Sequence, residues 1–182
     1  MSTLSLTEAQ TLTALRAFLV AVLPAGVEVV KGQDNKVAEP TGPDFVVMTP
    51  ILQERLSTNI VTFVDGFLTN PKTPTIRGDL AKVAVTIQID VHGPLASDNA
   101  RMIETMLRSD WGVDQFAASS PDVAPLYASS PKQIPFLNAE QQIETRWTMD
   151  AVLECNPIVT NPQDFAGALE VEVVEVDATY PP

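Results

Sequence analysis

The stretch KVAVTIQIDVH, residues 82–92, alternates along its whole length between two kinds of position. The odd-numbered positions carry only valine and isoleucine, whereas the even-numbered positions are mostly polar. Because successive side chains of a strand point to opposite faces, this pattern predicts one long strand with a dry face and a wetter face, as in an antiparallel sheet. Gly93-Pro94 is expected to end the strand.

A second long strand is predicted over residues 142–155, where apolar and polar positions alternate again. Its inward-facing set is expected to be Ile143, Thr145, Trp147, Met149, Ala151 and Leu153. Its outward-facing set is expected to include Glu144, Arg146, Asp150 and Glu154. Trp147 is interpreted as an anchor of the core. Two strands of this length, each apolar on one face, predict a sheet that packs this face against other elements.

Shorter strands are predicted where β-branched and aromatic residues cluster, at 27–30, 45–49, 55–65 and 169–177. The last of them loses its alternation at Val173-Val174, which indicates a bulge or a change of neighbour. Glycine and proline predict irregular structure over 32–44, 69–78 and 119–135. The chain is also expected to break at Asn156-Pro157 and at Asn161-Pro162.

Two helices complete the prediction. Thr7 and Gln10 have the spacing of a capping box, which predicts a helix from there to about Leu23. A second helix is predicted over residues 96–108, started by Ser97 or Pro94, and a short helical turn over 111–116. The expected fold class is therefore α+β, with a curved, mainly antiparallel sheet and flanking helices. The length of 182 residues fits one domain, 1–182.

The charge balance is strongly acidic, with 11 Lys and Arg against 23 Asp and Glu and a formal net charge of −12. This excess disfavours tight binding of nucleic acid but suits a surface past which DNA slides. The longest apolar stretch, residues 14–22, contains Arg16 and is too short to span a bilayer. No basic segment precedes an apolar stretch at the N-terminus. We therefore expect no membrane partner and a protein used in the cytoplasm of its host cell.

Candidate catalytic residues are few. His92 and Cys155 are the single histidine and the single cysteine. His92 is interpreted as a surface imidazole at the end of a strand, and Cys155 as a small core residue. Asp90, Asp150, Glu144 and Glu154 are interpreted as carboxylates that keep an exposed sheet face soluble. No nucleotide-binding loop and no EF-hand spacing occurs. The sequence predicts no catalytic, metal-binding or cofactor-binding residues, and a protein that is not an enzyme but acts by contact.

Several short motifs together resemble one known family, the phage neck and tail terminator (tail completion) proteins. The motifs that carry the resemblance are GQDN (32–35), GPDFVVMTP (42–50), VTIQIDVHGP (85–94), SDNA (97–100), PLYAS (125–129), RW (146–147), DAV (150–152), NP (156–157) and VDATYP (176–181). They span nearly the whole chain in the expected order, and their ordered sum is more specific than any one of them.

The resemblance implies a tail-terminator-like fold, a structural role and no catalytic residues. It implies a homo-oligomeric ring, typically hexameric, on the last ring of the tail tube. Such a ring stops tube growth and meets the tail tube protein on one side and neck or head-connector proteins on the other, while DNA passes through its lumen. The expected location is the neck of the virion, after assembly in the bacterial cytoplasm.

Two alternatives are left open by the residues themselves. One is another tail component, such as a tube or baseplate protein, and the other is a small-molecule-binding domain or hydrolase that uses His92. For assembly, three segments are candidate contact regions: 32–44, 119–135 and 169–177. The residues predicted to make contacts with subunits or partners are Gln33, Asp34, Asn35, Tyr127, Pro131, Glu170, Glu172, Glu175 and Asp177. Each segment could equally be an ordinary loop or sheet member.

Overall fold

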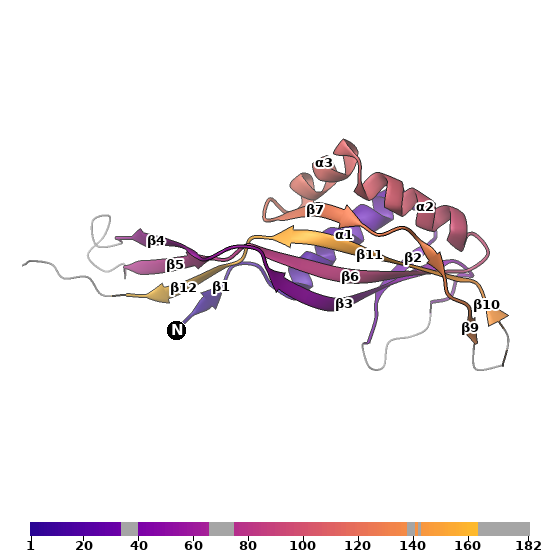
Figure 1. Cartoon of the computed structure of the whole chain (residues 1–182), viewed down its shortest axis with the longest axis horizontal. Coiled ribbons are helices and arrows are strands. Elements are labelled where there is room, and N and C mark those ends of the chain that lie inside the picture. Colours follow the sequence, from indigo (N-terminus) through magenta and orange to yellow (C-terminus); the bar gives the residue numbers. More distant parts are fainter. Residues whose placement is uncertain (34–39, 66–74, 138–140, 142, 164–182) are drawn as a thin grey trace, which may run out of the picture.

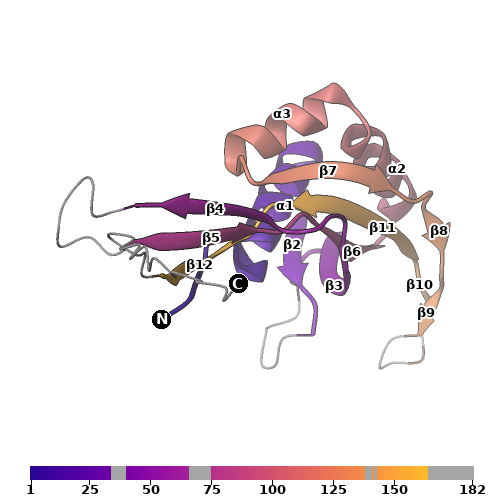
Figure 2. The ribbon, with the colours of Figure 1, turned by 60° about the vertical axis from the view of Figure 1, so that its left-hand side comes forward.

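The computed structural model of the chain describes residues 1–33, 40–65, 75–137, 141 and 143–163. Its helices are α1 Glu8–Val22, α2 Ala96–Leu107 and α3 Asp110–Ser119. Its strands are β1 Thr3–Leu4, β2 Glu28–Lys31, β3 Phe45–Arg55, β4 Ile60–Val64, β5 Ile76–Leu80, β6 Val83–His92, β7 Val123–Ala128, β8 Lys132–Gln133, β9 Phe136–Leu137, β10 Ile143–Glu144, β11 Arg146–Cys155 and β12 Ile158–Pro162. The three helices gather on one side of a large sheet, and a smaller sheet projects from its end (Figures 1 and 2).

The large sheet has the strand order β2-β3-β6-β11-β7, with β8 paired to β11 as well. The two predicted long strands are its centre, since β6 and β11 pair antiparallel from Arg146 opposite His92 to Cys155 opposite Val83. The valines and isoleucines of β6 meet the helices in one hydrophobic core, as their alternation predicts. Only β2 and β3 pair in parallel among the described strands. The α+β class with a mainly antiparallel sheet is confirmed.

The helices attach to this sheet through apolar stripes. The predicted capping box of α1 is present, because Gln10 N donates to Thr7 Oγ1 and Thr7 N donates to Gln10 Oε1, at 3.3 and 2.8 Å. Phe18 of α1 is buried and stacks on Phe116 of α3 with ring centroids 5.3 Å apart. This contact ties the first helix of the chain to the third.

The residue at the start of α2 and the length of α3 differ from the prediction. Neither Ser97 nor Pro94 caps α2, because the N-cap is Leu95, whose N–H donates to Asp44 Oδ1 at 2.9 Å. The predicted turn at 111–116 is part of the ten-residue helix α3, which Ser109 caps by accepting from Gly112 N at 3.2 Å. A hydrogen bond to a distant residue such as Asp44 leaves no local signal in the sequence.

Two strand predictions were wrong in their extent. β3 does not end at residue 49 but continues through Pro50 to Arg55, with a register shift between Pro50 and Leu52. A bulge of this kind accommodates a proline that lacks a backbone donor. Residues 55–65 are therefore not one strand, since β3 ends at Arg55 and β4 begins at Ile60.

Proline misled the prediction in two further places. Residues 119–135 are not irregular throughout, because β7 passes through Pro125 at the edge of the large sheet, where a missing N–H is tolerated. Asn161-Pro162 does not break the chain but ends β12. β5 also begins inside the predicted loop 69–78.

The start of the second long strand also differs from the prediction. Ile143 is not inward-facing but 76% exposed, because β10 leaves the large sheet to pair with β9.

Candidate assembly surface

The smaller sheet, called the arm sheet below, has the strand order β1-β12-β5-β4. Three of its strands continue strands of the large sheet: β4 follows β3, β5 precedes β6, and β12 follows β11. At the junction, Ala81 N donates to Pro157 O at 3.1 Å and Leu56 N donates to Lys82 O at 2.8 Å. The helices pack on the large sheet, and the arm sheet extends past them (Figure 1).

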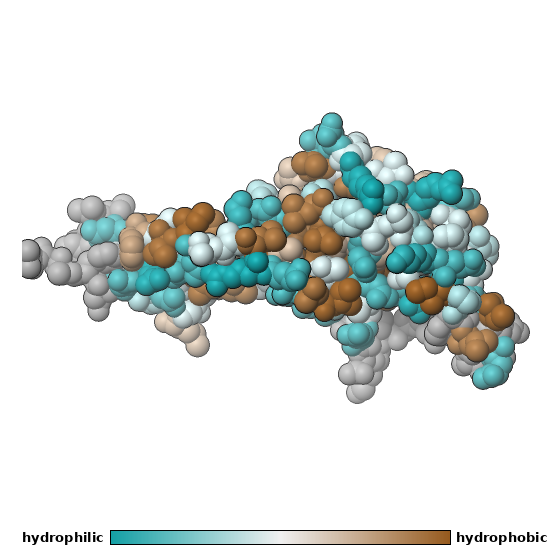
Figure 3. Space-filling view, viewed as in Figure 1, coloured by the Kyte–Doolittle hydropathy of each residue, from teal (hydrophilic) through white to brown (hydrophobic). Residues whose placement is uncertain are grey.

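Both faces of the arm sheet carry apolar side chains. The pairing places Ile60, Leu80 and Ile158 in one row on one face. Val61, Val159 and Leu4 lie on the opposite face. The large exposed apolar residues of the arm sheet are Leu4, Ile60, Val61, Phe63, Val64 and Val159. Figure 3 shows hydrophobic surface along β4. Exposed apolar side chains on both faces make the arm sheet a candidate contact surface.

The first predicted contact segment is only partly described. Gln33 is exposed and has a positive φ of 61°, next to Gly32, whose N–H donates to Met48 O at 2.8 Å. At the far end of the segment, the Thr41 hydroxyl and backbone N–H donate to Glu28 Oε1 at 2.7 and 2.9 Å. These bonds lower the pKa of Glu28. Asp34 and Asn35 lie outside the described residues, so the predicted cluster at 33–35 is seen only at Gln33.

The second predicted contact segment includes Tyr127 and Pro131. Tyr127 lies on β7 and is 53% exposed, and the guanidinium of Arg108 sits 4.9 Å from the centre of its ring. Arg108 Nε also donates to Ala128 O at 3.1 Å, which fixes the guanidinium over the ring. Pro131 is half-buried between β7 and β8. Tyr127 thus has an accessible ring on an edge strand, and Arg108 covers one face of that ring.

The third predicted contact segment, with Glu170, Glu172, Glu175 and Asp177, lies outside the described residues. The structure therefore does not bring the three predicted segments together into one described site. The arm sheet is a surface that the sequence analysis did not single out. Part of its signal was present in the strand-forming stretch 55–65, but nothing local shows that the helices leave this stretch uncovered, and residues 76–80 were expected to lie partly in a loop.

His92 is less exposed than predicted. Its ring stacks on Phe45 with centroids 4.5 Å apart and an angle of 5° between the ring planes, and the side chain is half-buried. Burial lowers the pKa of His92, an effect that the nearby Asp90 carboxylate opposes. A half-buried imidazole that stacks on Phe45 at the end of a strand is a packing arrangement.

Asp90 corrects the interpretation that the outward carboxylates are simply exposed. Asp90 is only 8% exposed, although it lies on the sheet face away from the helices. Arg146 Nε donates to its Oδ1 at 3.0 Å, and Gln88 Nε2 donates to its Oδ2 at 2.8 Å. These two partners satisfy the carboxylate and cover it.

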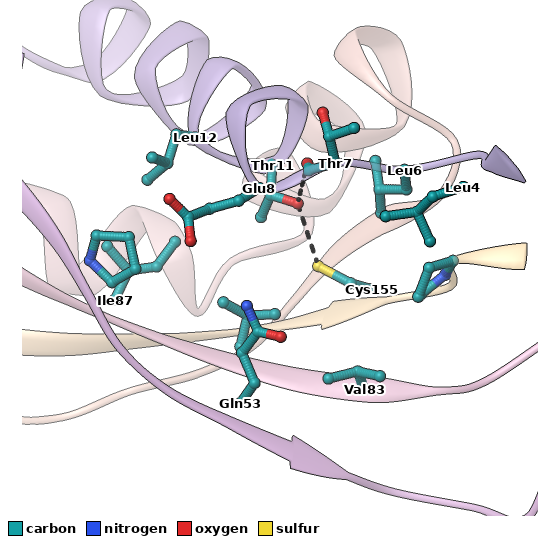
Figure 4. Close-up of a pocket in the computed structure, with 13 residues that line it drawn as sticks. Leu4, Leu6, Thr7, Glu8, Thr11, Leu12, Gln53, Val83, Ile87 and Cys155 are labelled. Carbon is teal, nitrogen blue, oxygen red and sulfur yellow. Dashed lines mark hydrogen bonds between the residues drawn. The ribbon is translucent and has the colours of Figure 1, made fainter. Parts of the chain in front are cut away.

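Cys155 is buried, as predicted, and lines a pocket of about 300 Å³ between α1 and the root of the arm sheet (Figure 4). Its Sγ lies 3.7 Å from the Thr11 hydroxyl. Burial raises the pKa of the thiol, which keeps it protonated and unreactive. Most of the other side chains that line the pocket are apolar, among them Leu6, Leu12 and Ile87.

The described residues show neither a metal site nor a membrane-spanning helix. Within the described ranges, no group of three or more His, Cys, Asp or Glu side chains is arranged to hold a metal ion. Among the helices of the described residues, none combines the length and apolar character needed to cross a bilayer.

The comparisons with known proteins agree with the resemblance seen in the sequence. No curated protein matches the chain. The sequence model of a family described as phage neck terminator protein matches residues 9–180. This is a family of structural phage proteins that act in tail completion. Since the match spans nearly all of the 182 residues, the chain belongs to the phage neck terminator protein family.

Proposed function

We propose that this chain forms a ring, of six copies, at the head–tail junction of the virion. The ring caps the last ring of the tail tube, ends tube growth and connects the tube to neck or head-connector proteins. DNA passes through its lumen without specific binding. Residues 1–182 act in this assembly as one structural domain without catalytic activity, and assembly takes place in the cytoplasm of the bacterial host.

The observation that carries this proposal is the arm sheet. It projects beyond the helices and exposes apolar side chains on both faces, including Val61 at 40% and Val64 at 62%. A surface of this kind is stable when another chain covers it. When a projection on one copy meets a different surface on the next, the contact is head-to-tail, and its repetition closes a ring when the rotation between copies divides a full turn.

Two further features support the ring. The net charge of −12 favours a lumen that repels the phosphates of passing DNA. The predicted contact residues Gln33 and Tyr127 are exposed and accessible to a neighbour or partner. We propose that Asp34, Asn35, Pro131, Glu170, Glu172, Glu175 and Asp177 take part in the same contacts.

Electron microscopy of the purified protein mixed with tail tubes tests the proposal. We expect one ring at one end of each tube and no further growth when tube subunits are added. The Val64→Lys variant should lose the caps, whereas Val20→Lys, which adds the same charge at an exposed position of α1, should keep them. Filaments formed by this protein alone would identify it as a tube component. Tubes that continue to grow in its presence would reject the capping role.

A further inference from the structure

A groove of about 520 Å³ lies open between α1 and α2, on the side of the molecule that carries the helices. Its apolar lining includes Val22 of α1, Met102 and Met106 of α2, and Trp111 of α3. Met102 and Trp111 are 37% and 36% exposed. Methionine side chains adapt to the shape of a neighbour, and tryptophan is enriched where the binding energy of an interface is concentrated. The groove is therefore suited to receive an apolar side chain of another chain.

Arg101 lines the same groove and differs from the other arginines of the chain. In the part of the chain that the structure describes, no ion pair or hydrogen bond holds its guanidinium, whereas each of the other arginines bonds to a described residue. Asp98 also lines the groove, three residues earlier on α2, but the described contacts include no ion pair between the two. A carboxylate on the occupant of the groove would therefore find a guanidinium beside the apolar lining.

We propose that the end of β4 on one copy docks in this groove of the next copy, with Val64 against Met102. Asp65, the next residue of the arm sheet, then lies beside Arg101. This inference rests on the proposed ring and names the surface that receives the arm sheet. Val64 is 62% exposed, and Asp65 is exposed as well. An apolar side chain followed by a carboxylate thus meets an apolar side chain preceded by a guanidinium, so that the two surfaces are complementary in charge and polarity.

The position of β4 in its own copy makes a second copy the occupant. β4 is held against β5 along its whole length, from Ile60 opposite Leu80 to Val64 opposite Ile76. The arm sheet projects from one end of the large sheet, and α2 lies toward the other end (Figures 1 and 2). β4 therefore does not reach the groove of its own chain. Because the projecting strand and the groove are different surfaces of one copy, their contact is head-to-tail, as the proposed ring requires.

Cross-linking between copies tests the docking. In a Cys155→Ser background, Val64→Cys is introduced into one preparation of the full chain and Met102→Cys into another. After mixing, assembly on tail tubes and oxidation, we expect disulfide-linked dimers in the mixture and in neither preparation alone. Leu126→Cys in place of Met102→Cys is the matched control, because Leu126 is an apolar residue of the edge strand β7 that is 48% exposed and does not line the groove. It should not link to Val64→Cys.

Exchange of the two charges is a second test. Arg101→Glu and Asp65→Arg should each raise the protein concentration needed for half-maximal ring formation on tubes about fivefold or more, because like charges then face each other. The double variant restores opposite charges and should form rings at about the concentration of the parent chain. Lys132→Glu is the control, since it makes the same change of charge at an exposed position of β8 and should leave ring formation unchanged. All four variants should unfold in urea like the parent chain.

Several outcomes overturn the docking and leave the ring standing, provided that the parent chain caps tubes. Assembly without a link between Val64→Cys and Met102→Cys shows that the groove does not receive β4. A link to Leu126→Cys shows that the arm sheet meets β7 instead, and a linked dimer of Val64→Cys alone shows that two arm sheets meet. A double charge variant that forms rings no better than Arg101→Glu shows that the two charges do not face each other. If the parent chain forms no ring on tubes, the proposed function itself is rejected, and the docking with it.

Discussion

Arg146 on β11 and Asp90 on β6 form an ion pair across the two central strands, with Nε 3.0 Å from Oδ1. The pair lies on the face of the large sheet that the helices do not cover. Asp90 is nevertheless only 8% exposed, because Arg146 and Gln88 both bond to it. The pair therefore fixes the alignment of the two central strands from the side opposite the hydrophobic core.

Replacing Arg146 with alanine should lower the free energy of unfolding by about 2 kcal/mol or more, because the buried Asp90 carboxylate then has Gln88 as its remaining described hydrogen-bond partner. Urea unfolding at neutral pH measures the change. Lys82→Ala is the control, since Lys82 pairs with Glu154 at 3.1 Å in a more exposed position. It should cost less than about 1 kcal/mol. Equal losses for the two variants would contradict the prediction.

Gly93→Ala should lower the free energy of unfolding by about 1–3 kcal/mol through backbone strain. Gly93 has a φ of 105°, and an added Cβ would press on Pro43 O and on Asp44. Gly42→Ala is the matched control, because a Cβ added at Gly42 would lie 3.7 Å from its nearest neighbour, Asp44 O, which is an ordinary contact distance. Gly42→Ala should change stability by no more than about 0.5 kcal/mol. Urea unfolding of both variants shows whether backbone strain destabilises Gly93→Ala or whether the turn tolerates the added Cβ.

His92 should make stability fall in mildly acidic solution. Burial lowers its pKa below the ordinary value of 6.5, with Asp90 and Glu144 opposing this effect and Arg146 adding to it. The unfolded chain then binds the proton more tightly than the folded chain, so protonation favours unfolding. The contribution of His92 is fully present above pH 6.5 and is lost as the pH falls toward the lower pKa of the folded state.

The difference between the parent chain and His92→Asn isolates this contribution. Their free energies of unfolding, measured in urea at pH values between 5 and 8, should differ in slope below pH 6.5 and run parallel above it. Carboxylates elsewhere contribute equally to both curves. Parallel curves over the whole range would show that His92 titrates alike in the folded and unfolded chains.

Cys155 should react slowly with thiol reagents while the protein is folded. It is 3% exposed, and burial raises its pKa, so the reactive thiolate is scarce and shielded. Labelling should become fast when urea unfolds the chain. A Val20→Cys/Cys155→Ser variant, with its thiol at an exposed position of α1, should label fast in the folded state. Fast labelling of the folded parent chain would show that the pocket at Cys155 opens readily.

The parts of the fold that follow a local rule could be predicted from the sequence. The alternation over β6 and most of β11 and the capping box of Thr7 and Gln10 each depend on residues close together in the chain. The resemblance to neck terminator proteins was likewise present in short motifs, and the family match confirms it.

The parts that depend on distant partners could not be predicted. β7 keeps Pro125 because it lies at a sheet edge, and β12 extends through Asn161 because β5 pairs with it. The cover over Asp90 comes from Arg146, 56 residues away. For the assembly surface, the sequence indicated strands near 55–65, but their exposure depends on where the helices lie.

β11 runs on into β12 with only Asn156 and Pro157 between them. A pull on the arm sheet along β12 is therefore transmitted straight into β11, in the middle of the large sheet. There the force acts along the strand. The hydrogen bonds that join β11 to β6 from Arg146 to Cys155 then all resist the sliding of one strand past the other at the same time, instead of opening one after another. The backbone of this chain is thus arranged to carry tension from the arm sheet into the centre of the large sheet.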